Sequence, residues 1–172
     1  MASLQYAKES IVLKTVQDVA DNDKRTQSLE LMGSVVWRAK SVVLTASLAD
    51  ALLNNTKLTA LNLSECNLRD GALCSLADAL QHNATLFDLN LSHNKLGRPG
   101  LVHLAKRLTD NTGLMHLDLI GHRINSEVAS AFVEMFRTNL TLCKLIWKLD
   151  TPGYNLRFTE LTNRNTEIDR CV

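Results

Sequence analysis

Leucines recur along the central part of the chain with a fixed period. The segments that begin at Leu58, Leu86 and Leu114 read LTALNLSECNL, LFDLNLSHNKL and LMHLDLIGHRI, and each start lies 28 residues after the previous one. A fourth segment begins at Leu142 and follows the pattern only as far as Trp147. Self-similarity at a fixed period of this length is typical of a repeat architecture.

Each repeat begins with alternating apolar positions and continues with helical spacing. In the pattern LxxLxL, the alternation places the leucines on one side of a short strand. In the second half, Leu76, Ala77 and Leu80 recur at equivalent positions of the next units, and their spacing forms one stripe on a helix. Such strands and helices bury their apolar sides only by stacking on neighbouring units.

The sequence therefore predicts an α/β fold, namely a right-handed leucine-rich-repeat solenoid of about five βα units. Parallel strands lie about 4.8 Å apart, whereas packed helices need about 8–10 Å. The stack must therefore curve, with parallel strands on the concave face and helices on the convex face. We expect one domain over residues 1–172, with a helical N-terminal cap over 1–25, repeats over 26–57, 58–85, 86–113 and 114–141, and a terminal repeat with a C-cap helix over 142–172.

Several polar residues are assigned structural roles by their place in the repeat. Cys66, Asn94 and His122 share the ninth position, where we expect them to turn inward and satisfy backbone groups of the tight turn. The five histidines show no HxxxH or HExxH spacing, so neither a metal, a cofactor nor a histidine-based hydrolase is predicted. At the end of the chain, Trp147 should cover the open core, and Asn165 should face water.

Asparagines recur where the helical halves end. Asn83 and Asn139 occupy equivalent helix-exit positions, and both stand in N-x-S/T triplets that match the glycosylation acceptor pattern. Because the triplets follow the repeat and no secretion signal accompanies them, we interpret them as part of the repeat.

Composition narrows the classes of function. Nineteen Lys+Arg against 18 Asp+Glu give a net charge of +1, and no basic cluster suggests nucleic-acid binding. No apolar stretch reaches the length of a membrane span, and the first residues lack the core of a signal peptide. Phosphate-binding glycine loops and the GxSxG motif are absent, and the four cysteines show no paired spacing. We therefore expect a cytoplasmic, monomeric and non-catalytic adaptor or scaffold that binds another protein.

The outward positions of the strands form the candidate partner-binding surface. In LxxLxL, positions three, five and seven should project from the concave sheet, so Ser64 and Ser92 would project at position seven. The candidate partner-binding residues are Asp88, Asn90, His116, Asp118, Ile120, Lys144, Ile146 and Lys148. Outward isoleucines among charged residues favour a contact surface. The alternative is the convex helix face, which carries Lys106, Arg107, Glu134 and Arg137.

A repeat of this length with a full helix resembles the ribonuclease-inhibitor-like class of leucine-rich-repeat proteins. Within that class, residues 26–170 are most similar to the C-terminal leucine-rich domain of tropomodulins and leiomodins. The most specific similarity is the spacing of Lys144, Trp147, Gly153, Arg157, Asn165 and Arg170.

In that family the domain binds actin at filament pointed ends and has no enzymatic activity. The resemblance therefore implies actin as a candidate partner and pointed-end capping as the alternative to a general adaptor. Two departures from the family are expected. The short helical cap would replace the tropomyosin-binding N-terminal half, and the final NTEIDRCV carries mixed charge where the family is strongly basic.

Overall fold

The computed structural model describes the backbone of residues 2–148 and 155–170 and the side chains of residues 10–148 and 158–165. Its strands are β1 (Ser28–Glu30), β2 (Ala60–Asn62), β3 (Asp88–Asn90), β4 (His116–Asp118) and β5 (Lys144–Ile146). Its helices are α1 (Ala2–Ala20), α2 (Val35–Ala39), α3 (Ser41–Leu52), α4 (Asp70–Leu80), α5 (Arg98–Leu108), α6 (Ser126–Met135) and α7 (Asn155–Arg170).

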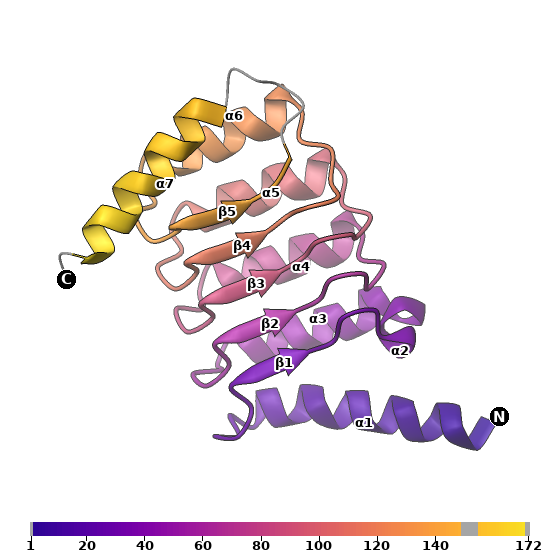
Figure 1. Cartoon of the computed structure of the whole chain (residues 1–172). Helices are drawn as coiled ribbons and strands as arrows, with labels where there is room; N and C mark the ends of the chain where they lie inside the picture. Colours follow the sequence, from indigo (N-terminus) through magenta and orange to yellow (C-terminus); the bar gives the residue numbers. More distant parts are fainter. Residues whose placement is uncertain (1, 149–154, 171–172) are drawn as a thin grey trace.

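The five strands form one parallel sheet in the order β1-β2-β3-β4-β5, which is also their order in the chain. Figure 1 shows this ladder of strands in front and helices α3 to α6 in a second layer behind it. The predicted leucine-rich-repeat solenoid is therefore confirmed, with the strands on its concave face and the helices on its convex face.

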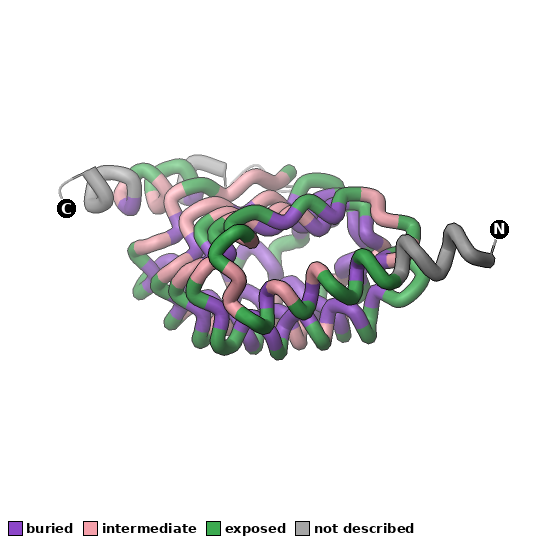
Figure 2. Tube along the Cα trace, turned by 90° about the horizontal axis from the view of Figure 1, so that it is seen from below, coloured by how far each residue is buried: buried purple, intermediate pink, exposed green. Residues whose placement is uncertain are grey.

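Leucines hold the two layers together. Leu61, Leu89 and Leu117 pair with one another across the sheet and are at most 2% exposed. Leu76 and Leu104 from the facing helices are completely buried in the same core. Viewed along the stack, the coils enclose a buried interior, and the exposed positions lie outside (Figure 2). The interior is thus one continuous core that passes from unit to unit.

The N-terminal end of this core is covered by α1, as the predicted helical cap requires. Val12, Val16 and Val19 lie on one side of that helix and are buried. The first unit is longer than the others because it contains the extra short helix α2. The indole Nε1 of Trp37 in α2 donates a hydrogen bond to Thr45 Oγ1 at 3.1 Å, and the Trp37 side chain is fully buried.

Aromatic rings cover the other end of the core. The Trp147 ring lies edge-on to Phe158 of α7 at 4.5 Å and to Phe132 of α6 at 5.0 Å between centroids. The prediction that Trp147 closes the open end is confirmed.

Of the residues that carry the family resemblance, Gly153 lies outside the described residues, as do the side chains of Arg157 and Arg170.

A ladder of buried asparagines links each unit to the one before it. Its members are Asn55, Asn83, Asn111, Asn139 and Asn165. The amide of Asn111 donates to the carbonyls of Leu80 at 2.6 Å and Asn83 at 2.9 Å. Its oxygen accepts from the backbone N–H groups of Gly113 and Leu114. One side chain therefore joins the end of the previous helix to the start of the next strand.

The prediction that Asn165 faces water is wrong. This side chain is completely buried, and its amide donates to the carbonyls of Asn139 at 3.2 Å and Leu142 at 2.8 Å. Those carbonyls lie at the open end of the stack, where no further repeat supplies an asparagine. Asn165 of α7 therefore completes the ladder from a helix instead of from a turn.

Replacement of Asn111 by alanine should lower the free energy of unfolding by about 3 kcal/mol. The change leaves two buried carbonyls, the buried N–H of Leu114 and the half-buried N–H of Gly113 without the amide that satisfies them. Urea unfolding followed by circular dichroism measures the loss. Asn54→Ala is the matched control, because it makes the same substitution at an asparagine that is exposed. Equal transition midpoints for the two variants would contradict the role assigned to the ladder.

Candidate functional site

The outward side chains of the strands form two rows across the concave face. The third repeat position supplies one row, and the pairing of the strands places Asp88 beside His116 and His116 beside Lys144. The fifth position supplies the second row, in which Asn90, Asp118 and Ile146 are neighbours: Asn90 pairs with Asp118, and Asp118 pairs with Ile146. Six of the eight predicted site residues are therefore brought together on adjacent strands.

The centre of the first row contains an acid–imidazole pair. Asp88 Oδ2 lies 3.1 Å from His116 Nδ1, and the two side chains are 50% and 35% exposed. The Phe87 ring packs edge-on against the imidazole, with 4.7 Å between centroids. This packing restricts the His116 side chain, so the pair holds exposed donor and acceptor groups in a fixed position on the concave face.

The polar residues of the second row have two roles: they lie on the concave face, and they fix the turn that follows each strand. Asn62, Asn90 and Asp118 each accept a hydrogen bond at the Oδ1 atom from the backbone N–H two residues later, at 2.9–3.0 Å. This contact is the Asx turn, in which a short side chain fixes its own backbone. The same residues therefore end the strands and contribute polar groups to the face.

The seventh position divides into two kinds of residue. Ser64 and Ser92 are buried, and each hydroxyl donates to the Oδ1 atom of the preceding asparagine at 2.7 Å. The prediction that these two serines project from the sheet is wrong. Each serine hydroxyl is instead hydrogen-bonded to the Oδ1 atom of the asparagine that forms the Asx turn. Ile120 has no hydroxyl, and it is 39% exposed. Lys148 is also exposed, as predicted.

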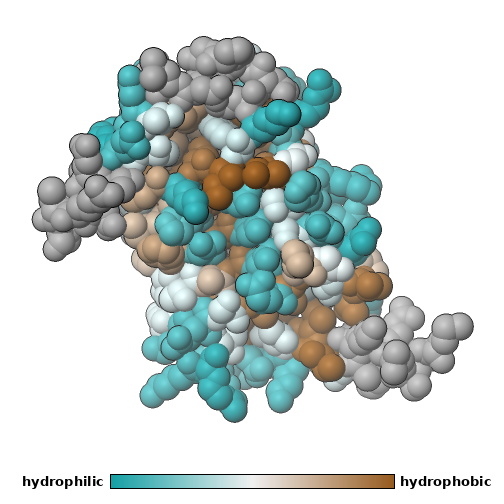
Figure 3. Space-filling view, viewed as in Figure 1, coloured by the Kyte–Doolittle hydropathy of each residue, from teal (hydrophilic) through white to brown (hydrophobic). Residues whose placement is uncertain are grey.

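Ile120 and Ile146 give the C-terminal half of the face an apolar element. Ile120 follows β4 closely, and Ile146 is the last residue of the neighbouring strand β5 and is half-buried. Figure 3 views this side of the molecule and shows a hydrophobic patch surrounded by hydrophilic residues. An apolar patch with a polar border is the usual composition of a protein contact surface.

Charged groups on the convex helices are largely paired with one another. Arg107 of α5 lies 2.7 Å from Asp78 of α4, which also contacts His103 at 2.7 Å. Arg137 pairs with Glu134 at 3.1 Å. Three of the four convex residues predicted as the alternative surface, Arg107, Glu134 and Arg137, are therefore engaged in ion pairs.

The inward ninth position has the structural role that was predicted. The Cys66 thiol donates to the carbonyl of Leu31 at 3.0 Å, and burial raises its pKa to about 11, so the thiol stays protonated. Asn94 donates to the carbonyls of Leu63 and Leu91 and accepts from the N–H of Leu68.

Within the part of the chain that the structure describes, no three His, Cys, Asp or Glu residues are grouped as a metal site. No helix of this part is long and apolar enough to cross a bilayer.

His122 occupies the same ninth position, but only one of its two ring nitrogens has a hydrogen-bond partner among the described residues. Its Nδ1 lies 2.9 Å from the carbonyl of Leu119, but its buried Nε2 has no partner among the described residues. Burial lowers the pKa of His122 below the ordinary value of 6.5. The folded chain thus holds the neutral imidazole, whereas the unfolded chain takes up a proton below about pH 6.5. Stability is therefore lost as the pH falls below that value.

His122→Asn should raise the free energy of unfolding by about 1 kcal/mol at pH 7, because an asparagine here can satisfy the turn as Asn94 does. The advantage of the variant over the wild type should grow between pH 7 and pH 5. Thermal unfolding across this range measures both effects. His82→Asn is the control, since His82 is exposed. A variant as sensitive to acid as the wild type would contradict the role of His122.

Together, the stacked βα units and the polar, partly apolar strand face define a leucine-rich-repeat protein of the kind that presents an extended concave surface. The family model described as the TMOD/LMOD leucine-rich domain matches residues 9–168, so the chain belongs to that family. The resemblance predicted from the sequence began at residue 26, whereas the match includes most of α1. Most of this helix is therefore part of the family domain.

Solved structures with the same fold support this assignment. The structure named "Leiomodin-1 Actin-Binding Site 2" is 22% identical, with a TM-score of 0.85 over 91% of this chain and 90% of that chain. The tropomodulin C-terminal domain of Caenorhabditis elegans is 16% identical, with a TM-score of 0.82 over 93% of this chain and 96% of that chain. Among curated proteins, none matches the sequence. At these identities, the structural likeness establishes the fold.

Proposed function

We propose that this chain is a non-catalytic protein-binding module whose partner is actin, bound across the concave strand face. Membership of the TMOD/LMOD leucine-rich domain family is the observation that carries the proposal. The similar structure of leiomodin-1 is itself named as an actin-binding site. Pointed-end binding or capping is the specific activity that the family suggests, and the cytoplasm is the compartment in which it would act.

The concave face supports this proposal through its chemistry. The Asp88–His116 pair and the carboxylate of Asp118 lie on the neighbouring strands β3 and β4, and the apolar Ile120 follows β4. The strand backbone holds them in fixed positions, which lowers the entropy that a partner must overcome on binding. A general adaptor would use the same face for another protein, so the identity of the partner decides between these two functions.

The effect on pointed-end elongation tests the partner directly. The wild-type chain at micromolar concentration should slow elongation of actin filaments whose barbed ends are blocked. Unchanged elongation, together with no binding to actin in sedimentation, would refute actin as the partner and leave the adaptor function.

The repeats themselves supply conservative substitutions that test the face. Asp88→Ala introduces the residue that β2 has at this position, Ala60, and Asp118→Asn introduces the residue that β2 and β3 have. Both variants keep the strand geometry, and Asp118→Asn keeps the oxygen of the Asx turn. The double variant should weaken actin binding by about tenfold, which corresponds to about 1.4 kcal/mol.

The matched control is Asp50→Ala with Asp110→Asn, which removes the same two charges from exposed positions outside the strands. It should bind actin as the wild type does. Equal weakening by both pairs of substitutions would show a dependence on net charge alone and would reject the concave face as the binding site.

A further inference from the structure

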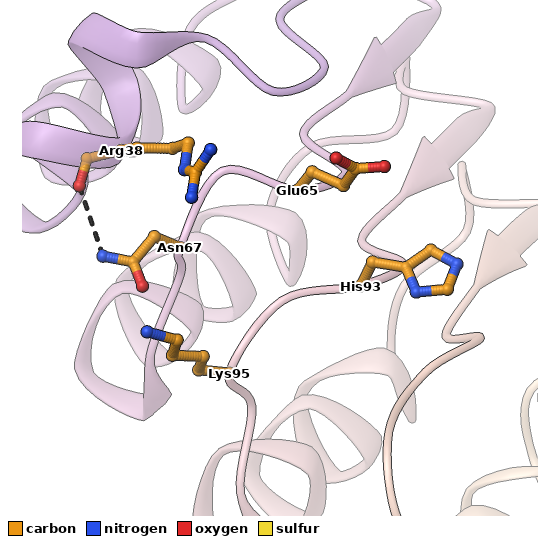
Figure 4. A pocket seen from close by; sticks show the side chains of 5 residues that line it. All are labelled: Arg38, Glu65, Asn67, His93 and Lys95. Atoms are coloured by element: carbon orange, nitrogen blue, oxygen red, sulfur yellow. Dashed lines mark hydrogen bonds between the residues drawn. The ribbon is translucent and has the colours of Figure 1, made fainter.

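A cavity of about 320 Å³ opens at the edge of the solenoid where the strands pass into the helices. It is lined by Arg38, Glu65, Asn67, His93 and Lys95. Arg38 lies in α2, and the other residues lie in the turns after β2 and β3, so three consecutive units contribute (Figure 4). None of these residues belongs to the rows of the concave face.

Two cations supply the positive charge of this cavity. Neither Arg38 nor Lys95 forms an ion pair with a residue whose side chain the structure describes. Figure 4 shows both side chains on the same side as Asn67, whereas Glu65 and His93 point away from them. Asn67 donates a hydrogen bond to the backbone carbonyl of Arg38 at 3.3 Å, which ties the walls of the cavity together. The pocket therefore contains two cations and one carboxylate, that of Glu65, and neither cation is in ion-pair contact with a described side chain.

The backbone of the turns is unusual at this cavity. The eighth repeat position needs a left-handed backbone, which glycine adopts freely. Gly33 and Gly121 occupy the equivalent turns, with φ of 62° and 87°. Glu65 and His93 adopt φ of 56° and 55° in the two units around the cavity, although a side chain there costs about 1 kcal/mol. A glycine would be less strained at these two positions, but the chain has Glu65 and His93 there, and both side chains line the cavity.

We propose that this cavity is an oxyanion site that takes a phosphate group between Arg38 and Lys95. A phosphate group carries about two negative charges near neutral pH, which matches the two cations. The planar guanidinium of Arg38 presents paired donors to two phosphate oxygens, and the Lys95 ammonium adds a point charge. A single carboxylate would neutralise only one of these cations. The site is independent of the proposed binding of actin.

The cavity is open to solvent, so screening by water and salt limits the strength of each contact. Free phosphate should therefore bind with a Kd of about 1 mM. A phosphate group carried on a protein side chain would gain additional contacts between the rest of that chain and the polar wall at Asn67. Both sources share the same chemistry, and the strength of binding distinguishes them.

Nuclear magnetic resonance of the 15N-labelled full chain tests the site. Inorganic phosphate, a phosphoserine peptide and the same peptide without phosphate are each titrated at constant ionic strength. Both phosphate-bearing probes should cause saturable shifts of the Asn67 side-chain amide and the Lys95 backbone amide, and the unphosphorylated peptide should not. Binding of the phosphopeptide about tenfold tighter than phosphate would identify a phosphorylated side chain as the source, and equal affinity would identify free phosphate.

Arg38→Gln with Lys95→Gln should weaken phosphate binding by at least about tenfold. Both side chains are exposed, so the fold should persist, and thermal unfolding confirms this. The control Lys24→Gln with Lys106→Gln removes the same charge from exposed positions outside the cavity. Shifts that do not saturate, or unchanged affinity in the Arg38/Lys95 variant, would overturn the proposal.

Discussion

Every coil of this solenoid leaves buried backbone carbonyl and N–H groups inside the stack, and such groups need hydrogen-bond partners. The buried asparagines meet this constraint. In Asn83, Asn111 and Asn139, the amide donates to two carbonyls of the preceding unit, and the oxygen accepts from two backbone N–H groups of its own unit. The leucine core supplies most of the stabilisation, but it does not specify how one coil aligns with the next. The ladder does so, since an amide satisfies four backbone groups only when the units are in register.

The surface of the strands depends on this alignment. Because the units repeat in register, Asp88, His116 and Lys144 come to lie in one row although they are far apart in the chain. Packing does not constrain these outward positions, so they are free to differ between units. The face therefore changes along the stack, from Glu30 on β1 through the neutral residues of β2 to the charged and partly apolar residues of β3 to β5, while the interior stays nearly constant. This difference gives one end of the face a chemistry that the other end lacks.

Much of this arrangement could be predicted from the sequence, because the positions of strands and helices follow from local periodicity. The outward rows containing Asp88 and Asp118 followed directly from the alternation of leucines. The burial of Asn165 and of Ser64 could not be predicted from this alternation. Each side chain is buried because the fold places a hydrogen-bond partner beside it. The recurrence of asparagine at helix exits was the available signal for the ladder. The cavity at Arg38 was missed because α2 has no counterpart in the other repeats.

Hydroxyl-radical footprinting of the chain with and without actin tests most directly whether the strand face is the recognition surface. Actin should protect the side chains of His116, Ile120 and Ile146 from oxidation, while Leu53 and Val42 on the helical side stay equally reactive. Protection of Leu53 and Val42 with unchanged oxidation of the strand residues would show that actin does not bind the strand face.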